Sequence, residues 1–294
     1  MHELTQPMRL VLISGHSGSG KSVALGALED GGYYCVDNLP AKLLESLIDT
    51  YRDGLQGRTA GLAVGIDARA PRADLEALPD RLARLVETRP GLSVRRIFLE
   101  AATETLIARF SETRRRHPLT EGATSLAGAV AAETRLLADV RSDADLIIDT
   151  SATNVHGLRE MIRLRVLEHD RQHPSVLLQS FGFKRGIPLD TDFLFDVRHL
   201  PNPHWDPNLR ARDGRDAPVA RFLEAQEATH AVFDDIFRYL RGTLSRFADT
   251  DRSYLTISIG CTGGRHRSVY LVERLHRKLA QEVPQLHKRH RDLP

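Results

Sequence analysis

Short apolar runs alternate with amphipathic stretches along the first half of the chain. Strand-like runs occur at residues 9–14, 33–36, 59–66, 94–99 and 146–149. Between them, residues 43–53, 79–88, 125–140 and 154–166 space their apolar side chains three or four positions apart, as one face of a helix requires. This alternation predicts a parallel sheet flanked by helices, with Asn154 as the N-cap of the last helix.

The pattern changes after the polar, histidine-rich residues 168–174. A new strand is predicted at residues 175–180, followed by one long amphipathic helix at 219–247, a strand at 254–259 and a helix at 268–282. We therefore expect two α/β domains, residues 1–170 and the smaller residues 171–294. The basic end of the chain, KRHRDLP, is expected to be mobile.

Composition narrows the class of protein. The chain has 294 residues, of which 41% are hydrophobic and 27% charged, as in globular proteins. Its apolar runs are too short for a membrane span and its first residues lack a secretory pattern, so we expect a cytoplasmic protein without membrane contact. The two cysteines, Cys35 and Cys261, lie in different predicted domains, which argues against a disulfide framework or a four-cysteine zinc site.

The motif GHSGSGKS follows the first strand and precedes a helical run. It fits the P-loop pattern G-x-x-x-x-G-K-[ST] in its required strand-to-helix context. Such a loop directs backbone N–H groups at nucleotide phosphates, a lysine at the outer phosphates and a hydroxyl at Mg²⁺. The predicted phosphate-binding residues are Gly15, His16, Ser17, Gly18, Ser19, Gly20, Lys21 and Ser22, with Ser22 as the metal ligand.

The carboxylate partner of Mg²⁺ is not fixed by the sequence. Asp37, Asp67 and Glu100 each end a predicted strand, and an aspartate there is also a common turn former. We place Asp37 with Lys21 and Ser22 in the catalytic set. The three arginines at residues 114–116 fit either a segment that closes over phosphates in small nucleotide kinases or a solvated basic face.

A second candidate phosphate loop lies near the other end of the chain. CTGGRHRS has the C-x-x-G-x-x-R-[ST] spacing of Cys-dependent phosphatases, although Gly260 stands where those enzymes usually have histidine. We expect a phosphate-binding site without turnover; a phosphatase using Cys261, with Asp206 as general acid, and a structural turn are the alternatives. The predicted ligand contacts are His204, Thr262, Gly263, Gly264, Arg267 and Ser268.

Positive charge gathers beside this second loop. The whole chain carries a formal net charge of only +2, but residues 265–291 contain eight arginines and lysines against two glutamates. Such a surface suits nucleic-acid phosphates, and a solvated helix face is the alternative. The predicted RNA contacts are Lys278, Lys288, Arg289 and Arg291.

Taken in order along the chain, the motifs resemble those of the RapZ/YvcJ family of bacterial nucleotide-binding proteins. The P-loop is followed by EDGGYYCVDNLP, GIDARA, TRRRHPL, DLIIDTS, QSFGFKRGIP, FDVRHLPNPHWDP and SYLTISIGCTGGRHRSVYLVE. The resemblance implies slow hydrolysis of ATP and GTP, with Asp67, Ala68, Arg69 and Ala70 as the guanine-nucleotide contact. Other members tend to have a polar residue in place of Ala70, which weakens the expectation for GTP.

The resemblance also implies partners for the second domain. Some members bind small regulatory RNAs there, present them to an endoribonuclease and sense an amino-sugar phosphate; others are linked only to metabolism or competence. We therefore expect a homo-oligomeric nucleotide-binding regulator with weak ATPase and GTPase activity. The alternatives are a small-molecule kinase, a Cys261 phosphatase, and an adapter in which the P-loop is only structural.

Overall fold

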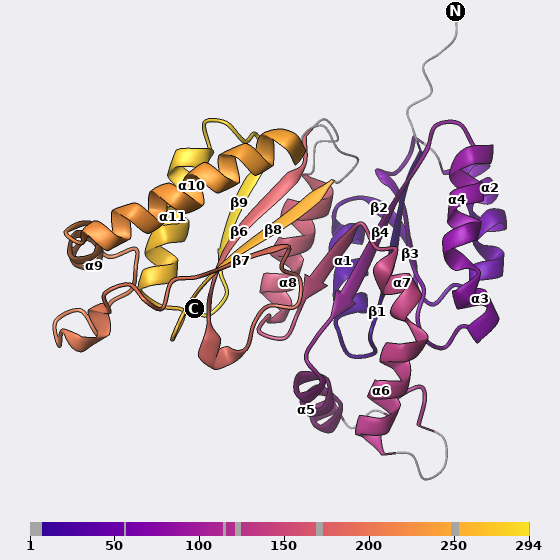
Figure 1. Ribbon diagram of the computed structural model, residues 1–294. Coiled ribbons are helices and arrows are strands. Elements are labelled where there is room, and N and C mark those ends of the chain that lie inside the picture. The colour runs from indigo at the N-terminus through magenta and orange to yellow at the C-terminus, as the bar shows by residue number, and fades with distance from the viewer. Residues whose placement is uncertain are drawn as a thin grey trace, which may run out of the picture. The chain divides into compact units, whose positions relative to one another are not determined.

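Two separate parallel sheets organise the chain (Figure 1). The computed structural model describes residues 8–55, 57–113, 116–120, 125–168, 173–247 and 253–293. The chain divides into two units, Met1–Glu168 and His169–Pro294, each with its own sheet. The predicted α/β fold class is confirmed for both halves.

The first unit has a five-stranded sheet. Its strands lie in the order β2-β3-β1-β4-β5, and all neighbouring pairs are parallel. The strands are β1 (Met8–Gly15), β2 (Tyr33–Val36), β3 (Gly61–Gly65), β4 (Leu92–Glu100) and β5 (Leu146–Asp149). The central strand β1 is buried on both faces, which explains why it reads as a nearly continuous apolar run.

Helices cover both faces of this sheet because alternate strand residues point to opposite sides. Leu10 and Leu12 of β1 pack in one cluster with the apolar stripes of the helices on one face, whereas Val11 and Ile13 are buried toward the other. Figure 1 shows α1 and α8 on one side of the sheet and α2, α3 and α4 on the other. The helices are α1 (Lys21–Asp30), α2 (Leu44–Gly54), α3 (Arg72–Glu76), α4 (Leu78–Thr88), α5 (Thr103–Thr113), α6 (Leu126–Leu136), α7 (Ala138–Ser142) and α8 (Val155–Ile162).

Two predicted helices of this unit differ in detail. The stretch at residues 125–140 is two helices, α6 and α7, separated at Leu137. Beyond Ile162 the predicted last helix continues as a π-helical turn, Arg163–Leu167. Its N-cap is as predicted, since the Asn154 side chain accepts a hydrogen bond from the Gly157 N–H at 2.8 Å.

The second unit has a four-stranded sheet. Its order is β7-β8-β6-β9, again with all pairs parallel. The strands are β6 (Ser175–Gly182), β7 (Phe193–Asp196), β8 (Tyr254–Cys261) and β9 (Leu286–His290). Both β6 and β8 are buried along their whole length, whereas β7 and β9 are the edge strands.

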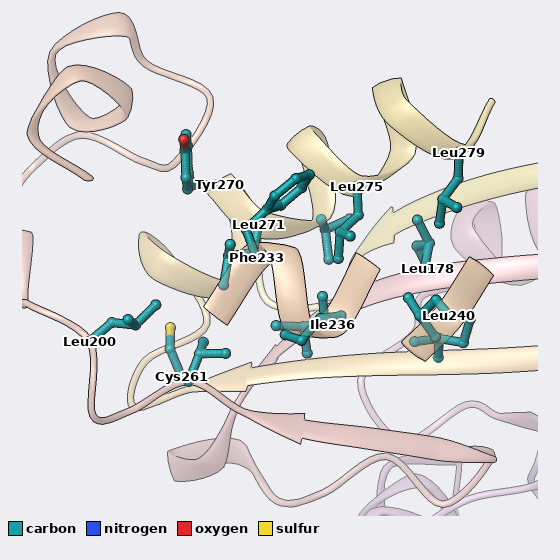
Figure 2. Close-up of a cluster of buried hydrophobic side chains, with 14 of the residues drawn as sticks. Leu178, Leu200, Phe233, Ile236, Leu240, Cys261, Tyr270, Leu271, Leu275 and Leu279 are labelled. Atoms are coloured by element: carbon teal, nitrogen blue, oxygen red, sulfur yellow. The ribbon is translucent and has the colours of Figure 1, made fainter. Parts of the chain in front are cut away.

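The core of the second unit lies between the sheet and three helices, α9 (Ala217–Glu224), α10 (Glu227–Phe247) and α11 (Arg267–Leu279). Figure 2 shows Ile236 and Leu240 of α10 facing Leu275 of α11 and Leu178 of β6. The same apolar cluster contains Cys261, whose sulfur lies near Leu200 in this view.

Two expectations for the second half were wrong, and one edge strand was not predicted. The helix predicted at residues 219–247 is two helices, because α9 ends at Glu224 and α10 begins at Glu227. The basic end of the chain is not a free tail, since β9 pairs with β6. The edge strand β7 escaped prediction because it is only four residues long and half-exposed.

Candidate functional site

The motifs singled out in the sequence lie where the strands end. In parallel sheets, ligands bind outside the carboxyl ends of the strands. The phosphate loop, residues 15–22, joins β1 to α1, and Asp37 and Asp67 follow β2 and β3. In the second unit, residues 262–266 connect β8 to α11 at the same end of the sheet as the segment after β7.

The phosphate loop has the backbone that its glycines predict. Gly15 has a φ of 143°, and a Cβ there would lie 2.1 Å from the Leu99 carbonyl oxygen, so no other residue fits. Gly20 is also left-handed, at φ 106°, immediately before α1 begins at Lys21. The loop therefore reaches the helix with the N–H groups of its first turn at the cleft.

Lys21 lies against its own loop. Its Nζ donates to the carbonyl oxygens of Gly15 at 2.7 Å and His16 at 3.1 Å. Burial lowers the pKa of Lys21, and the negative charges of Asp67, Glu133 and Asp37 oppose that effect. An anion placed beside this ammonium would favour its charged form.

A cleft of about 690 Å³ adjoins the loop, a size typical of small-molecule sites. Ser17 to Val23 form its base. Asp37, Asp67 and Arg69 line it on the side of β2 and β3. Thr150 and the residues that begin α8 line it on the side of β5, together with Arg109 and Arg116. Residues 114 and 115 lie outside the described residues.

The three candidate carboxylates have different partners. Asp37 is exposed in the cleft. Both oxygens of buried Asp67 accept from the Arg69 guanidinium, at 2.6–3.1 Å, and Glu100 is held in the same way by Arg141 at 2.7 and 2.9 Å. Burial alone would raise the pKa of Asp67, but the Arg69 hydrogen bonds and the Lys21 charge hold it below its ordinary value.

These partners decide which oxygens could reach Mg²⁺. The Ser22 hydroxyl is exposed at the cleft, and Asp37 is the carboxylate of the three that is not bound to an arginine by a described contact. Hydroxyl and carboxylate oxygens are the donors that Mg²⁺ prefers. Within the described residues, no group of three or more His, Cys, Asp or Glu side chains could hold a metal.

A buried carboxylate at the phosphate loop was missed by the sequence reasoning. Glu133 of α6 accepts the Ser17 N–H at 2.9 Å and the Ser17 hydroxyl at 2.7 Å. His117 completes the cluster, with Nε2 at 3.1 Å from Glu133 Oε2. No local pattern marks Glu133, because it is a single acid in an ordinary helical segment.

In the second unit, the predicted anion clamp is engaged with the protein. The Arg267 side chain is buried and donates to the carbonyl oxygens of Arg198 at 2.6 Å and Leu200 at 2.9 Å, and to the Thr262 hydroxyl at 3.1 Å. Arg267 therefore fastens the segment after β7 to the start of α11. Ser268 is also buried, with its Oγ 3.2 Å from Cys261 Sγ.

The exposed part of the second loop is its tip. Thr262 and Gly263 are exposed, whereas Gly264 is buried at φ 66° beside Gly182 of β6. The exposed His204 ring lies 6.4 Å from that of His266. Cys261 is only 3% exposed and belongs to the apolar core, a position that does not suit a nucleophile for a soluble phosphate ester (Figure 2).

The four predicted RNA contacts are not equivalent. Lys278 is exposed on α11, and Lys288 is exposed but forms an ion pair with Glu273 at 2.7 Å. Arg289 is half-buried. Arg291 is buried and donates to the Gly186 carbonyl oxygen at 2.6 Å, so its guanidinium is bound to protein inside the fold.

The fold and loops define a P-loop α/β protein with a second α/β unit. Residues 8–170 match the RapZ-like N-terminal domain and residues 174–294 match the RapZ C-terminal domain. The chain belongs to the RapZ family, which confirms the resemblance seen in its motifs.

Curated relatives cover nearly the whole chain. A "Nucleotide-binding protein" of Alkalilimnicola ehrlichii is 51% identical over 286 residues, 97% of this chain and 98% of the relative. One of Pseudomonas fluorescens, with the same name, is 49% identical over 286 residues, 97% of this chain and 100% of the relative.

Among solved structures, a sugar kinase from Janibacter sp. has a TM-score of 0.36 and 17% identity, covering 53% of this chain and 93% of its own. A shikimate kinase from Bacteroides thetaiotaomicron has a TM-score of 0.32 and 11% identity, covering 53% and 96%. Over the part of the chain that the structure describes, no helix is both long and apolar enough to cross a membrane.

Proposed function

We propose that the first unit binds ATP and GTP in the phosphate-loop cleft and hydrolyses them slowly. The observation that carries the proposal is the left-handed glycine loop between β1 and α1, with Lys21 at the base of a 690 Å³ cleft. The curated relatives described above, which match this chain over nearly their full length, are named nucleotide-binding proteins. The N–H groups of Gly18 to Ser22 bind the phosphates, and Lys21 exchanges its carbonyl partners for phosphate oxygens.

Hydrolysis requires charge neutralisation and a positioned water more than covalent chemistry. Ser22 and Asp37 would hold Mg²⁺, which when bound neutralises charge on the outer phosphates. The carboxylate of Asp67 is already bound to Arg69, which leaves it poorly placed to select guanine. We therefore propose that Asp67 and Arg69, the two residues of this segment that line the cleft, form part of its wall and that both nucleotides are accepted.

Equilibrium titration with fluorescent ATP and GTP analogues tests this function. Saturable binding that excess unlabelled ATP displaces supports it, together with slow phosphate release. No binding to the wild-type chain in the presence of Mg²⁺ would leave the P-loop a purely structural turn.

For the second unit we propose a regulatory site for a phosphorylated amino sugar at the tip of the second loop. Thr262 and Gly263 are exposed there, and the Lys184 N–H binds the Thr262 carbonyl oxygen at 3.2 Å, bringing the basic segment after β6 alongside. His204 is exposed near the same loop. In this arrangement Arg267 acts by shaping the loop, because its own guanidinium is bound to protein oxygens.

We also propose that this unit binds small regulatory RNA and delivers it to an endoribonuclease. Exposed Lys278 and Lys288 support a phosphate-binding face with little sequence readout. In this proposal the phosphate of the metabolite neutralises positive charge near the RNA-binding lysines and so lowers the affinity for RNA. By thermodynamic linkage, bound RNA lowers the affinity for the metabolite by the same factor. RNA affinity measured across a titration with hexosamine phosphates tests the coupling, and an unchanged affinity contradicts it.

A small-molecule kinase is the second candidate function. The exposed carboxylate of Asp37 lines the cleft on the side away from β5, where an acceptor hydroxyl would have room beside the phosphates. Stoichiometric transfer of the γ-phosphate to a metabolite, in place of release to water, would favour this function over the regulator.

A further inference from the structure

The tip of the phosphate loop is bound to a carboxylate from a distant part of the chain. Ser17 gives both its N–H and its hydroxyl to Glu133, which lies 116 residues further along. The Glu133 side chain is fully buried. Both of its oxygens accept hydrogen bonds from Ser17, so the carboxyl group is held in a fixed orientation.

His117 donates to the same carboxylate in a defined tautomer. Its Nδ1 accepts the Leu119 N–H at 3.2 Å, so the ring proton lies on Nε2 and is shared with Glu133 at 3.1 Å. The ring also packs against Phe110 of α5, with centroids 5.0 Å apart. Position and orientation of this imidazole are therefore fixed from three sides.

A peptide group two positions further along the loop is held by α5. Arg109 donates to the Gly18 carbonyl oxygen at 3.0 Å and to the Thr150 carbonyl oxygen at 2.6 Å. The N–H of Ser17 and the carbonyl of Gly18 are thus both fastened by residues outside the loop. The tip cannot move without breaking one of these contacts.

Glu133 and His117 do not line the cleft, but the chain neighbours of His117, Arg116 and Pro118, do. This separation excludes direct contact with a nucleotide and leaves an indirect role. The start of α1 holds the inner phosphates, so the loop tip lies toward the terminal phosphate. His117 joins that tip to the backbone that carries Arg116.

We propose that Glu133 and His117 are positioning residues that set Arg116 and the Ser17–Gly18 tip in register around the terminal phosphate. The inference rests on the proposed nucleotide site and concerns how that site distinguishes a triphosphate from a diphosphate. A triphosphate engages both the tip and Arg116, whereas a diphosphate reaches only the inner part of the loop. The contacts of Glu133 and His117 therefore raise the affinity for ATP and leave the affinity for ADP almost unchanged.

Affinities for ATP and ADP in matched variants test the link. Glu133→Gln replaces one acceptor by a donor facing Ser17 and His117, and His117→Phe keeps the ring contact with Phe110 but removes the donor. Each should weaken ATP binding about tenfold, the effect of losing a charge-assisted hydrogen bond, and weaken ADP binding less than about threefold. Glu104→Gln on α5 and Arg135→Ala on α6, both exposed, are the controls.

A double-mutant cycle with Arg116→Ala separates positioning from general destabilisation. If His117 acts through Arg116, the combined variant loses no more ATP affinity than the worse single variant; independent structural effects would add. Equal losses for ATP and ADP, or additive losses, overturn the inference while the nucleotide site stands. Absence of ATP binding in the wild type overturns both. Should Glu133→Gln fail to fold, the cycle with His117→Phe decides alone.

Discussion

Lys21 Nζ donates to the Gly15 carbonyl oxygen at 2.7 Å, so the P-loop lysine is hydrogen-bonded to the first residue of its own loop. The contact satisfies a partly buried ammonium, and in the proposed nucleotide complex a phosphate oxygen replaces the carbonyl. The positive charge is therefore already at the loop, and nucleotide binding as proposed would require Lys21 only to exchange hydrogen-bond partners.

Replacing this lysine should separate the roles of the two units. We expect Lys21→Ala to reduce ATP affinity at least about a hundredfold, because a desolvated charge contact is lost. Lys42→Ala, in a different segment of the same unit, and Arg267→Ala, in the second unit, should retain wild-type affinity. Fluorescent-nucleotide titration measures all three, and loss of ATP binding in Arg267→Ala would contradict the division of labour between the units.

Gly182 should tolerate no side chain. A Cβ there would lie 2.5 Å from the Gly263 carbonyl carbon and 2.7 Å from the Gly264 nitrogen, and neither backbone atom can yield without moving the second loop. We expect Gly182→Ala to lower the free energy of unfolding by about 1–3 kcal/mol. Urea denaturation measures the change.

Gly242 is the matched control for Gly182. It lies inside α10, and nothing lies within 4 Å of a Cβ built on it. Gly242→Ala should raise the free energy of unfolding by about 1 kcal/mol, because alanine favours a helix over glycine. Equal effects of the two substitutions would show that the contact between β6 and the second loop is looser than described.

Local patterns predicted the elements whose signal is contained in a few neighbouring residues. The P-loop strand and the cap at Asn154 are of this kind, since turn, cap and strand chemistry all occur within one short segment. The edge strand β9, Leu286–His290, was missed because its alternation contains lysine, arginine and histidine and reads as a basic tail. Only pairing with β6 makes it a strand.

Long-range partners explain what the sequence could not reveal about the sites. Arg267 and Arg291 read as free charges, but both donate to backbone carbonyl oxygens that tertiary structure brings near. Glu133 reads as a surface acid, although it is fully buried against Ser17. The sequence records that a charge is present, and the fold decides whether the charge is already satisfied.

His16 should make the first unit less stable in acid. Both ring nitrogens are buried and have no hydrogen-bond partner among the residues that the structure describes, and burial lowers the pKa of His16 despite the charges of Glu133 and Glu100. Below pH ~6.5 the unfolded chain therefore binds a proton at His16 while the folded ring stays neutral. This contribution to stability is present above that pH and is lost as pH falls. The slope contributed by one such group is at most about 1.4 kcal/mol per pH unit.

Urea unfolding at several pH values below 7 measures this effect. As pH falls, the free energy of unfolding of His16→Leu should increase relative to that of the wild type, because leucine cannot titrate and leaves no unpartnered nitrogen. His156→Leu, at an exposed position of α8, is the control for removing an imidazole. Parallel stability curves for the wild type and His16→Leu would show that the His16 ring can be protonated in the folded state.

The two thiols should both resist modification, for different reasons. Burial, aided by the charge of Glu29, raises the pKa of Cys35 to about 11, so its thiol stays protonated in mildly alkaline solution. In Cys261→Ser, the rate of iodoacetamide labelling at Cys35 should rise with pH toward a midpoint near 11. Glu29→Gln in the same background should shift that midpoint to lower pH.

Cys261 is protected by packing, since it is 3% exposed within the apolar core and its Sγ lies 3.2 Å from Ser268 Oγ. In Cys35→Ser, labelling of Cys261 should therefore require opening of the fold. The labelling rate of the native protein should lie well below that of an unfolded control and should increase when urea is added. The same variant should release no phosphate from an aryl phosphate. Rapid labelling of Cys261 in the native state, accompanied by aryl-phosphate hydrolysis that Cys261→Ser abolishes, would instead make the second loop a phosphatase site.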